Sequence, residues 1–206
     1  MNVRILKRFV IYMAILTFVM FTVWAFVRSF MNRPPGDYET EVCDIRLKDK
    51  LYNEAIEAAN TALVKTPNHR GAIMCKALVF ISQKMYLEAT EELNYLIKFL
   101  EKNLEVDDRT GKGTLAAAYA NRGIIKDRSK NYEGALQDYV KALGIDHDAV
   151  AGPGLGTIIL NYKFKSSSVK ERALYLNEQL QLPESERVLS IKELDEGQVM
   201  HKPGKL

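Results

Sequence analysis

The sequence predicts an all-α protein in which pairs of helices stack behind one hydrophobic N-terminal helix. The first observation is an internal repeat, because a stretch that starts with Tyr and has Ala three positions later begins at Tyr52, Tyr86 and Tyr132. These starts are 34 and then 46 residues apart, and 46 is the same period plus 12 inserted residues. A period of this size is typical of repeat architectures. The second observation is an uncharged run of 19 residues, Phe9 to Val27.

Composition limits the class of protein. The 206 residues allow one domain with a small appendage, and a net charge of +3 is too balanced to indicate nucleic-acid binding. Cys43 and Cys75 are too few for a disulfide framework. They either pair, if the repeats bring them together, or lie in the core as small buried residues, which is the interpretation we favour. His69, His147 and His201 share no metal-ligand spacing, so no metal site is expected.

The uncharged run predicts a transmembrane anchor over residues 9–29, after a basic tail over residues 1–8. Nineteen helical residues span about 28 Å at 1.5 Å per residue, close to the hydrocarbon thickness of about 30 Å. Tyr12 and Trp24 lie towards the ends, where aromatic rings favour the membrane interface. The alternative, a cleaved signal peptide, is disfavoured because the run is long and Arg28 opens R-S-F-M instead of an A-x-A site.

Basic residues lie on both sides of this run. Arg4, Lys7 and Arg8 precede it together with the amino terminus, whereas Arg28 and Arg33 are the basic residues that follow it closely. Basic residues are retained on the cytoplasmic side of a membrane. We therefore expect a single-pass protein of the bacterial inner membrane, with its N-terminus in the cytoplasm and its main domain in the periplasm.

Each repeat is predicted to be a helix, a short turn and a second helix. In the first repeat, a helix over about residues 38–48 follows a linker over residues 30–37, and Pro67 ends the second helix. The second repeat covers about residues 70–103. Neither helix of a pair can bury its apolar stripe alone, so stacking of the repeats supplies the missing partner. In the first repeat that stripe consists of Tyr52, Ala55, Ile56, Ala59, Ala62 and Leu63.

This pattern resembles the tetratricopeptide repeat (TPR) family over about residues 38–148. The resemblance rests on the Ala spacing of the second helix, the aromatic residue before it and the closing proline. The third repeat fits closely, with Tyr119, Gly123, Tyr132, Ala135 and Ala142. The resemblance implies a TPR-type helical-hairpin solenoid over residues 38–182, with three repeats and a degenerate fourth unit or capping helix. The small Gly123 and Ala135 let the two helices of a repeat approach closely.

Three later segments depart from the repeat. Residues 100–115 are expected to add helical turns that end in a mobile Gly-rich loop, or alternatively a loop that contacts a partner. A fourth unit begins over residues 150–164 and degenerates. Ser168 and Glu171 form a capping box that opens a helix through about Leu180.

The C-terminal tail, residues 183–206, carries a few apolar residues among many charges. We expect a loosely attached segment. The alternative is a linear segment that docks on the protein's own groove or on a partner, because Val188, Leu189, Ile191 and Leu194 recur at regular spacing.

No set of residues indicates catalysis. The pairs Glu91–Glu92 and Asp107–Asp108 are adjacent, and adjacent residues on a helix do not face a common point. The segment G-K-G-T from Gly111 lacks the upstream glycine and the strand of a phosphate loop. We therefore expect no enzyme, no cofactor and no small-molecule substrate.

The TPR resemblance implies a concave groove lined by the first helix of each repeat, and a protein segment as its ligand. The lining is mostly apolar and lacks the Lys/Asn clamp of family members that bind a terminal carboxylate, so it suits an amphipathic helix or an extended segment. For Leu78 and Ile124, core packing between neighbouring helices is an equal alternative. The predicted groove residues are Thr40, Asp44, Leu47, Met74, Leu78, Ile81, Ser82, Ala120, Ile124, Asp127 and Arg128.

The leading functional hypothesis is a membrane-anchored scaffold or assembly factor that recruits protein partners, because anchoring raises the effective concentration of a binding groove near membrane complexes. One alternative is an N-anchored targeting or import receptor with a cytosolic TPR domain. Another is a regulatory subunit of a membrane complex. The orientation of the domain separates the receptor from the scaffold.

Overall fold

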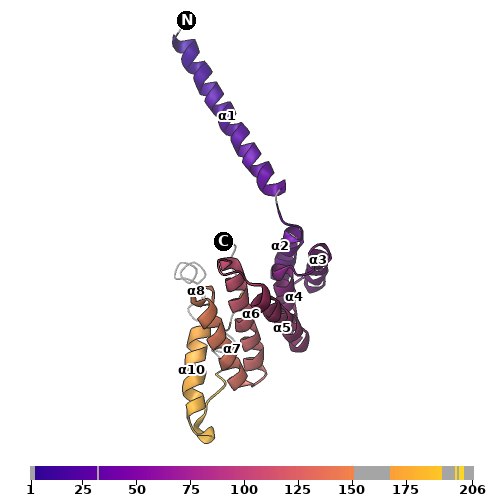
Figure 1. Cartoon of the computed structure of the whole chain (residues 1–206), viewed down its shortest axis with the longest axis vertical. Helices are drawn as coiled ribbons and strands as arrows, with labels where there is room; N and C mark the ends of the chain where they lie inside the picture. The colour runs from indigo at the N-terminus through magenta and orange to yellow at the C-terminus, as the bar shows by residue number, and fades with distance from the viewer. Residues whose placement is uncertain (1–2, 32, 151–167, 192–197, 199, 202–206) are drawn as a thin grey trace.

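The computed structural model describes residues 3–31, 33–150, 168–191, 198, 200 and 201, and the regular elements in these ranges are all helical. The first helix, α1 (Val3–Met31), stands away from the others, which pack against one another in succession (Figure 1). The later elements are α2 (Asp37–Lys48), α3 (Tyr52–Lys65), α4 (Arg70–Ser82), α5 (Tyr86–Asn103), α6 (Arg109–Arg128), α7 (Tyr132–Ile145), α8 (His147–Val150), α10 (Val169–Gln181) and the 3-10 turn η1 (Glu184–Glu186).

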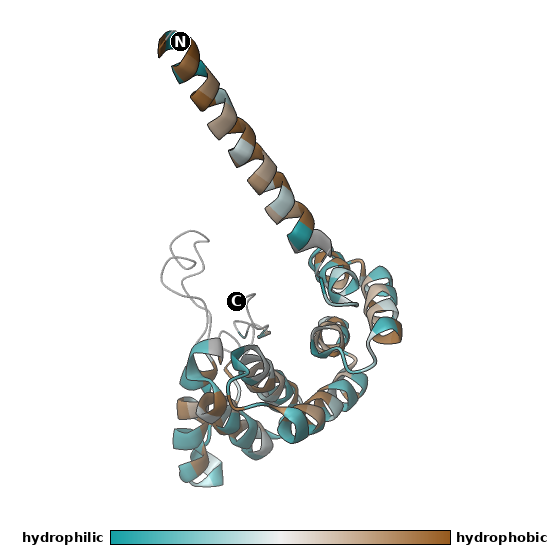
Figure 2. Cartoon of the chain, turned by 45° about the horizontal axis from the view of Figure 1, so that its top comes forward, coloured by the Kyte–Doolittle hydropathy of each residue, from teal (hydrophilic) through white to brown (hydrophobic). Residues whose placement is uncertain are grey.

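Helix α1 is long and apolar enough to cross a membrane, and the residues of its most apolar stretch are not buried against the rest of the protein. It is hydrophobic along most of its length (Figure 2). Its two threonines satisfy their hydroxyl groups inside the helix, since Thr17 donates to the carbonyl of Met13 and Thr22 to that of Val19, both at 2.8 Å. The helix therefore presents few unsatisfied polar groups to apolar surroundings.

The two helices of each pair are joined by the same backbone turn. Lys50, Lys84 and Lys130 have positive φ angles of 60°, 61° and 64°. In each turn the Lys N–H donates to the carbonyl three residues back, at 3.1, 3.0 and 2.9 Å, and the next N–H donates to the carbonyl five residues back, at 2.8, 2.9 and 2.8 Å. These lysines have the same spacing as the repeated tyrosines, so the sequence repeat is also a repeat of backbone geometry.

The helix pairs α2–α3, α4–α5 and α6–α7 contact one another in chain order, and the first helices of successive pairs also touch. The repeated alanines Ala55, Ala89 and Ala135 are fully buried. A Cβ atom added to Gly123 would lie 2.6 Å from a ring carbon of Tyr139, so only glycine permits this approach of α6 to α7. This confirms the prediction that small residues set the distance between paired helices.

Cys43 of α2 and Cys75 of α4 form a disulfide, with their Cα atoms 6.5 Å apart. The expectation of two unpaired core residues is wrong, although both cysteines are fully buried in a cluster with Ala55, Ala59 and Val79. The reason lies in the stacking: α2 packs directly on α4, which brings together residues 32 positions apart.

The linker joins the domain through Gly36, which caps α2 with a φ of 96°. The hydroxyl of Thr66 donates to the carbonyl of Pro35 at 2.7 Å, and His69 Nε2 lies 2.8 Å from a carboxylate oxygen of Asp37. The residues at the start of α2 are thus tied to the end of α3 and the start of α4.

The insertion after Leu100 does not end in a Gly-rich loop. Helix α5 continues to Asn103, and α6 already begins at Arg109, so the G-K-G-T segment is the first part of a 20-residue helix. The Asp108 carboxylate caps this helix by accepting the N–H of Gly111 at 2.7 Å. The inserted residues therefore lengthen two helices and leave a short connection between them.

Helix α10 begins at the predicted capping box, since the Ser168 hydroxyl accepts the Glu171 N–H at 3.2 Å and the Glu171 carboxylate accepts the Ser168 N–H at 3.0 Å. It packs against α7. The expected fourth unit over residues 150–164 lies, apart from Val150, outside the described residues.

Candidate functional site

The predicted groove residues differ in exposure. Asp44, Leu47 and Ser82 are partly exposed and Arg128 is exposed. The other seven are buried, which means that an external ligand could reach them only if a covering segment moved. The buried members are Thr40, Met74, Leu78, Ile81, Ala120, Ile124 and Asp127.

Two of the buried members, Ile124 and Asp127, lie on α6 where it meets α7, α10 and the C-terminal tail. We define the tail-binding face by Asn121, Ile124 and Asp127 of α6, Tyr139 of α7 and Arg172 of α10. We define the tail segment as residues 188–191 together with 198, 200 and 201. The tail-binding face thus combines three helices and receives a fourth part of the chain.

An ion pair occupies the centre of the tail-binding face. Arg172 donates from Nε and Nη2 to the two carboxylate oxygens of Asp127, each at 2.7 Å. The side chains are only 1% and 4% exposed, so this bidentate pair is shielded from water. It joins α10 to α6, and the Tyr139 hydroxyl donates to the same carboxylate at 3.2 Å.

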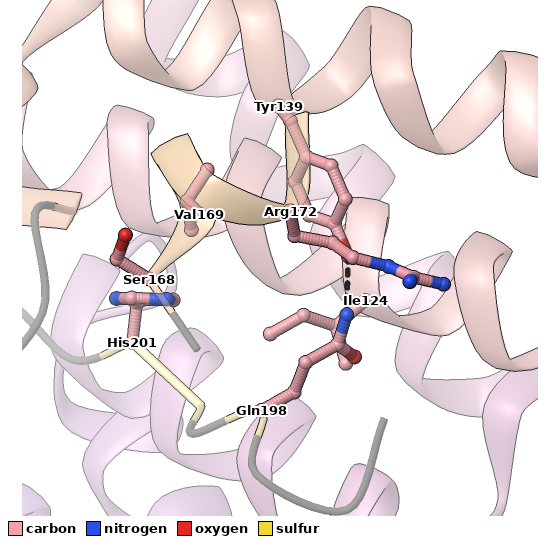
Figure 3. Close-up of a pocket in the computed structure, with 7 residues that line it drawn as sticks. All are labelled: Ile124, Tyr139, Ser168, Val169, Arg172, Gln198 and His201. Carbon is pink, nitrogen blue, oxygen red and sulfur yellow. Dashed lines mark hydrogen bonds between the residues drawn. The ribbon is translucent and has the colours of Figure 1, made fainter. Parts of the chain in front are cut away.

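Gln198 brings the tail segment to this ion pair. Its side-chain amide donates to Asp127 at 2.8 Å and lies 3.3 Å from the Tyr139 hydroxyl oxygen, and the residue is 8% exposed. Figure 3 shows Gln198 and Tyr139 pointing towards each other beside Arg172. The carboxylate of Asp127 on α6 therefore binds groups from three other segments of the chain, α7, α10 and the tail.

Asn121 holds the tail by its backbone. Its side-chain amide donates to the carbonyl of His201 at 2.7 Å, and its side-chain oxygen accepts the His201 N–H at 2.8 Å. Asn121 is fully buried, and its amide nitrogen also lies 3.5 Å from the sulfur of Met74 on α4. An amide that pairs with both backbone groups of one residue recognises an extended chain without reading its side chain.

Residues 188 and 189 are held in a similar way. The Val188 N–H donates to the Gln179 side chain at 2.8 Å, and the Val188 carbonyl accepts a hydrogen bond from the Tyr175 hydroxyl. The Leu189 carbonyl accepts from Arg172 at 2.9 Å. Leu189 and Met200 also pack against the main hydrophobic core. The described part of the tail is therefore attached to the domain, contrary to the expectation of a loose segment.

Burial shifts the pKa of two groups where the tail meets the helices. It raises the pKa of Tyr139 well above its usual value, and the nearby negative charge of Asp127 raises it further. Burial also lowers the pKa of His201 to about 4. Both side chains are consequently neutral at pH 7.

Seven residues line a small pocket where these groups meet (Figure 3). Its volume of about 10 Å³ corresponds to roughly one water site. A larger pocket of about 200 Å³ adjoins it, lined by Asp127, Arg128, Lys130, Tyr132, Ser190 and Gln198. The second pocket is partly basic and lies between the end of α6 and the tail segment.

A second buried carboxylate joins α6 to α7. Asp138 is 2% exposed, accepts two hydrogen bonds from Arg122 at 2.8 and 2.7 Å, and lies 2.8 Å from the ammonium of Lys126. Arg122 also donates to Asn94 of α5 at 2.7 Å. This cluster aligns three helices beside the tail-binding face.

The sequence-based groove prediction included Ile124 and Asp127 of this face, but it did not include Asn121, Arg172 or Gln198. One signal was present: Asn121 and Asp127 are polar residues within a helix that is otherwise rich in Ala, Gly and Ile. Arg172 lies on the buried face of α10 with Val169, Ala173 and Leu176, and its burial depends on the distant carboxylate of Asp127.

Among the described residues, no group of three or more His, Cys, Asp or Glu side chains is arranged to hold a metal ion. The chain matches no protein-family model and no curated protein.

Proposed function

We propose that this protein is a membrane-anchored TPR-type scaffold or assembly factor that binds protein segments on its helical domain. The observation that carries the proposal is the tail-binding face, which already holds a non-helical segment of the chain through hydrogen bonds from Asn121 to its backbone. A surface able to bind one extended segment in this way has the chemistry needed to bind another.

The TPR-type architecture is part of this proposal. It is supported by the three identical turns at Lys50, Lys84 and Lys130 and by the contacts between successive first helices. The predicted groove residues that retain exposure are the ones we expect to contact a partner, namely Asp44, Leu47, Ser82 and Arg128.

The proposed location is the bacterial inner membrane, with the helical domain in the periplasm. Helix α1 is long and apolar enough to cross a membrane, and this supports α1 as the membrane anchor of the protein. The Cys43–Cys75 disulfide supports the oxidising side of the membrane, because reducing systems keep most cytosolic thiols reduced. The same disulfide argues against an import receptor with a cytosolic domain.

Site-specific photocrosslinking in living cells tests the proposal. A photoreactive residue at Leu47 or Arg128 should give discrete crosslinks to other proteins, whereas the same residue at Val64, which is 84% exposed on α3, should not. Crosslinks at none of the three positions would contradict a scaffold function. A reporter enzyme that is active only in the periplasm, fused after residue 206, would test the orientation.

A further inference from the structure

The tail segment is bound by groups that suit a ligand as well as they suit a structural element. The hydrogen bonds to His201 and Leu189 involve backbone atoms, and Val188 is held by both of its backbone groups. Such contacts are available to any polypeptide in an extended conformation. Among the described tail residues, Gln198 is the one whose side chain makes the main hydrogen bonds to the tail-binding face, to Asp127 and Tyr139.

The ion pair beneath the tail does not depend on the tail for its charge balance. If the tail left, Asp127 would keep both hydrogen bonds from Arg172 and the bond from Tyr139. No buried charge would lose its countercharge, which is the most costly consequence of removing a buried partner. The amide of Asn121 would become accessible to water or to another chain. Departure of the tail would therefore cost the hydrogen bonds of Asn121 and Gln198 and the apolar contacts of Leu189 and Met200, but it would break no buried charge pair.

The larger pocket indicates the charge of a suitable segment. Ser190 and Gln198 both line it, together with the basic residues Arg128 and Lys130. The six residues between Ile191 and Gln198 read K-E-L-D-E-G, with three acids and one base. This stretch lies outside the described residues, and its acidic composition is complementary in charge to Arg128 and Lys130.

We propose that the tail-binding face is a receptor for an extended protein segment with acidic residues ahead of a Gln or Asn side chain, and that the chain's own C-terminal segment occupies it until a partner's segment replaces it. The inference rests on the proposed function in one respect, that the competitor is a protein. In this arrangement the tail sets a threshold: a partner must bind more tightly than a tethered ligand at high effective concentration.

Exchange of the tail tests the proposal on the full chain in detergent micelles. A protease site is inserted into the exposed turn at Glu184–Glu186, so that cutting removes the tether and leaves every residue present. The probe is a fluorescent peptide of residues 188–206. We expect the uncut protein to bind this peptide at least about tenfold more weakly than the cut protein, because the tethered tail competes.

Matched variants show whether binding uses the predicted contacts. A peptide with His201→Pro lacks the N–H that Asn121 accepts and should bind about tenfold more weakly, whereas His201→Ala keeps the backbone and should lose much less. Asn121→Ala in the cut protein should abolish this difference. Equal affinity of the two peptides for the cut wild-type protein would overturn the inference.

Hydrogen exchange on the uncut protein gives an independent measurement that does not require a new variant. Amides of the tail should exchange at least about tenfold faster than the central amides of α6 and α7, because the tail opens without global unfolding. Equal protection, or a cut protein that never exchanges its tail, would make the tail a permanent part of the fold. That result would leave the scaffold proposal intact if Leu47 still crosslinks to partners. Tail exchange without any crosslinked partner would instead refute the scaffold proposal and the protein competitor, while the exchangeable tail would stand.

Discussion

The two ends of the helical domain are stabilised by different chemistry. At the α2–α4 end, a disulfide between Cys43 and Cys75 lies among alanines and Val79. At the α6–α10 end, a buried ion pair between Asp127 and Arg172 joins two helices and receives the tail. A covalent crosslink holds the first end whatever lies on its surface. A polar cluster allows the second end to exchange one hydrogen-bonding partner for another, which is what a binding face requires.

The largest expected effect comes from removing Arg172. Arg172→Ala leaves the 4%-exposed Asp127 side chain without its cation, and we expect a loss of about 3–5 kcal/mol in the free energy of unfolding. Urea denaturation followed by circular dichroism measures it. Arg46→Ala is the matched control, because Arg46 and Glu54 form an exposed pair and its loss should cost under about 1 kcal/mol. Equal effects would remove the distinction between the ion pair and a surface contact.

The disulfide should contribute next. It closes a loop with a sequence separation of 32, so reduction or the double change of Cys43 and Cys75 to Ser should lower the free energy of unfolding by about 2–4 kcal/mol. Denaturation with and without reductant measures this, and the Ser variant should be insensitive to reductant. If reductant does not destabilise the wild-type protein, the stability of the α2–α4 end does not depend on the disulfide.

Acidification should weaken the docking of the tail segment on the tail-binding face. The pKa of His201 is lowered from 6.5 to about 4 by burial, so between these values the released tail binds more protons than the docked tail. Docking is therefore strongest above pH 6.5 and weakens as the pH falls towards 4, by about 2 kcal/mol between pH 7 and pH 5. The imidazole lines a small pocket together with Tyr139, Arg172 and Gln198, and burial is the cause of its lowered pKa.

Hydrogen exchange of the tail at pH 7 and pH 5, corrected for the intrinsic dependence on pH, measures this effect. His201→Ala should remove the additional weakening while keeping the bonds from Asn121 to the backbone. A wild-type tail that is equally protected at both pH values would show that the imidazole is not desolvated by docking.

A smaller effect concerns the contact of α6 with α7. Gly123→Ala places a methyl group against the Tyr139 ring, and we expect a loss of about 1–3 kcal/mol in the free energy of unfolding. Gly144→Ala is the control, since a Cβ there has no neighbour within 4 Å and alanine should stabilise the helix by about 0.5–1 kcal/mol. Thermal denaturation of both variants measures the difference, and a stabilised Gly123→Ala protein would contradict the close packing.

Several elements could be predicted because their signals are local. The Ala spacing located α3, α5 and α7, the Ser168–Glu171 box located the start of α10, and the uncharged run located α1. The Gly-rich part of the insertion was misjudged, because an N-cap at Asp108 and the packing of Thr114 to Ala118 in the core outweigh the low helix propensity of two glycines. The TPR assignment and the groove remain predictions.

The sequence by itself determined the helix pairs, their turns and the hydrophobic N-terminal helix, because these follow from residues only a few positions apart. Only the tertiary structure decided that Cys43 meets Cys75, that Arg172 neutralises Asp127 and that Asn121 pairs with His201, 80 positions away. Contacts at such separations depend on how the helices stack and carry no periodic signal along the chain. The stacked helices thus placed the tail on a face whose role could not be read from any one segment.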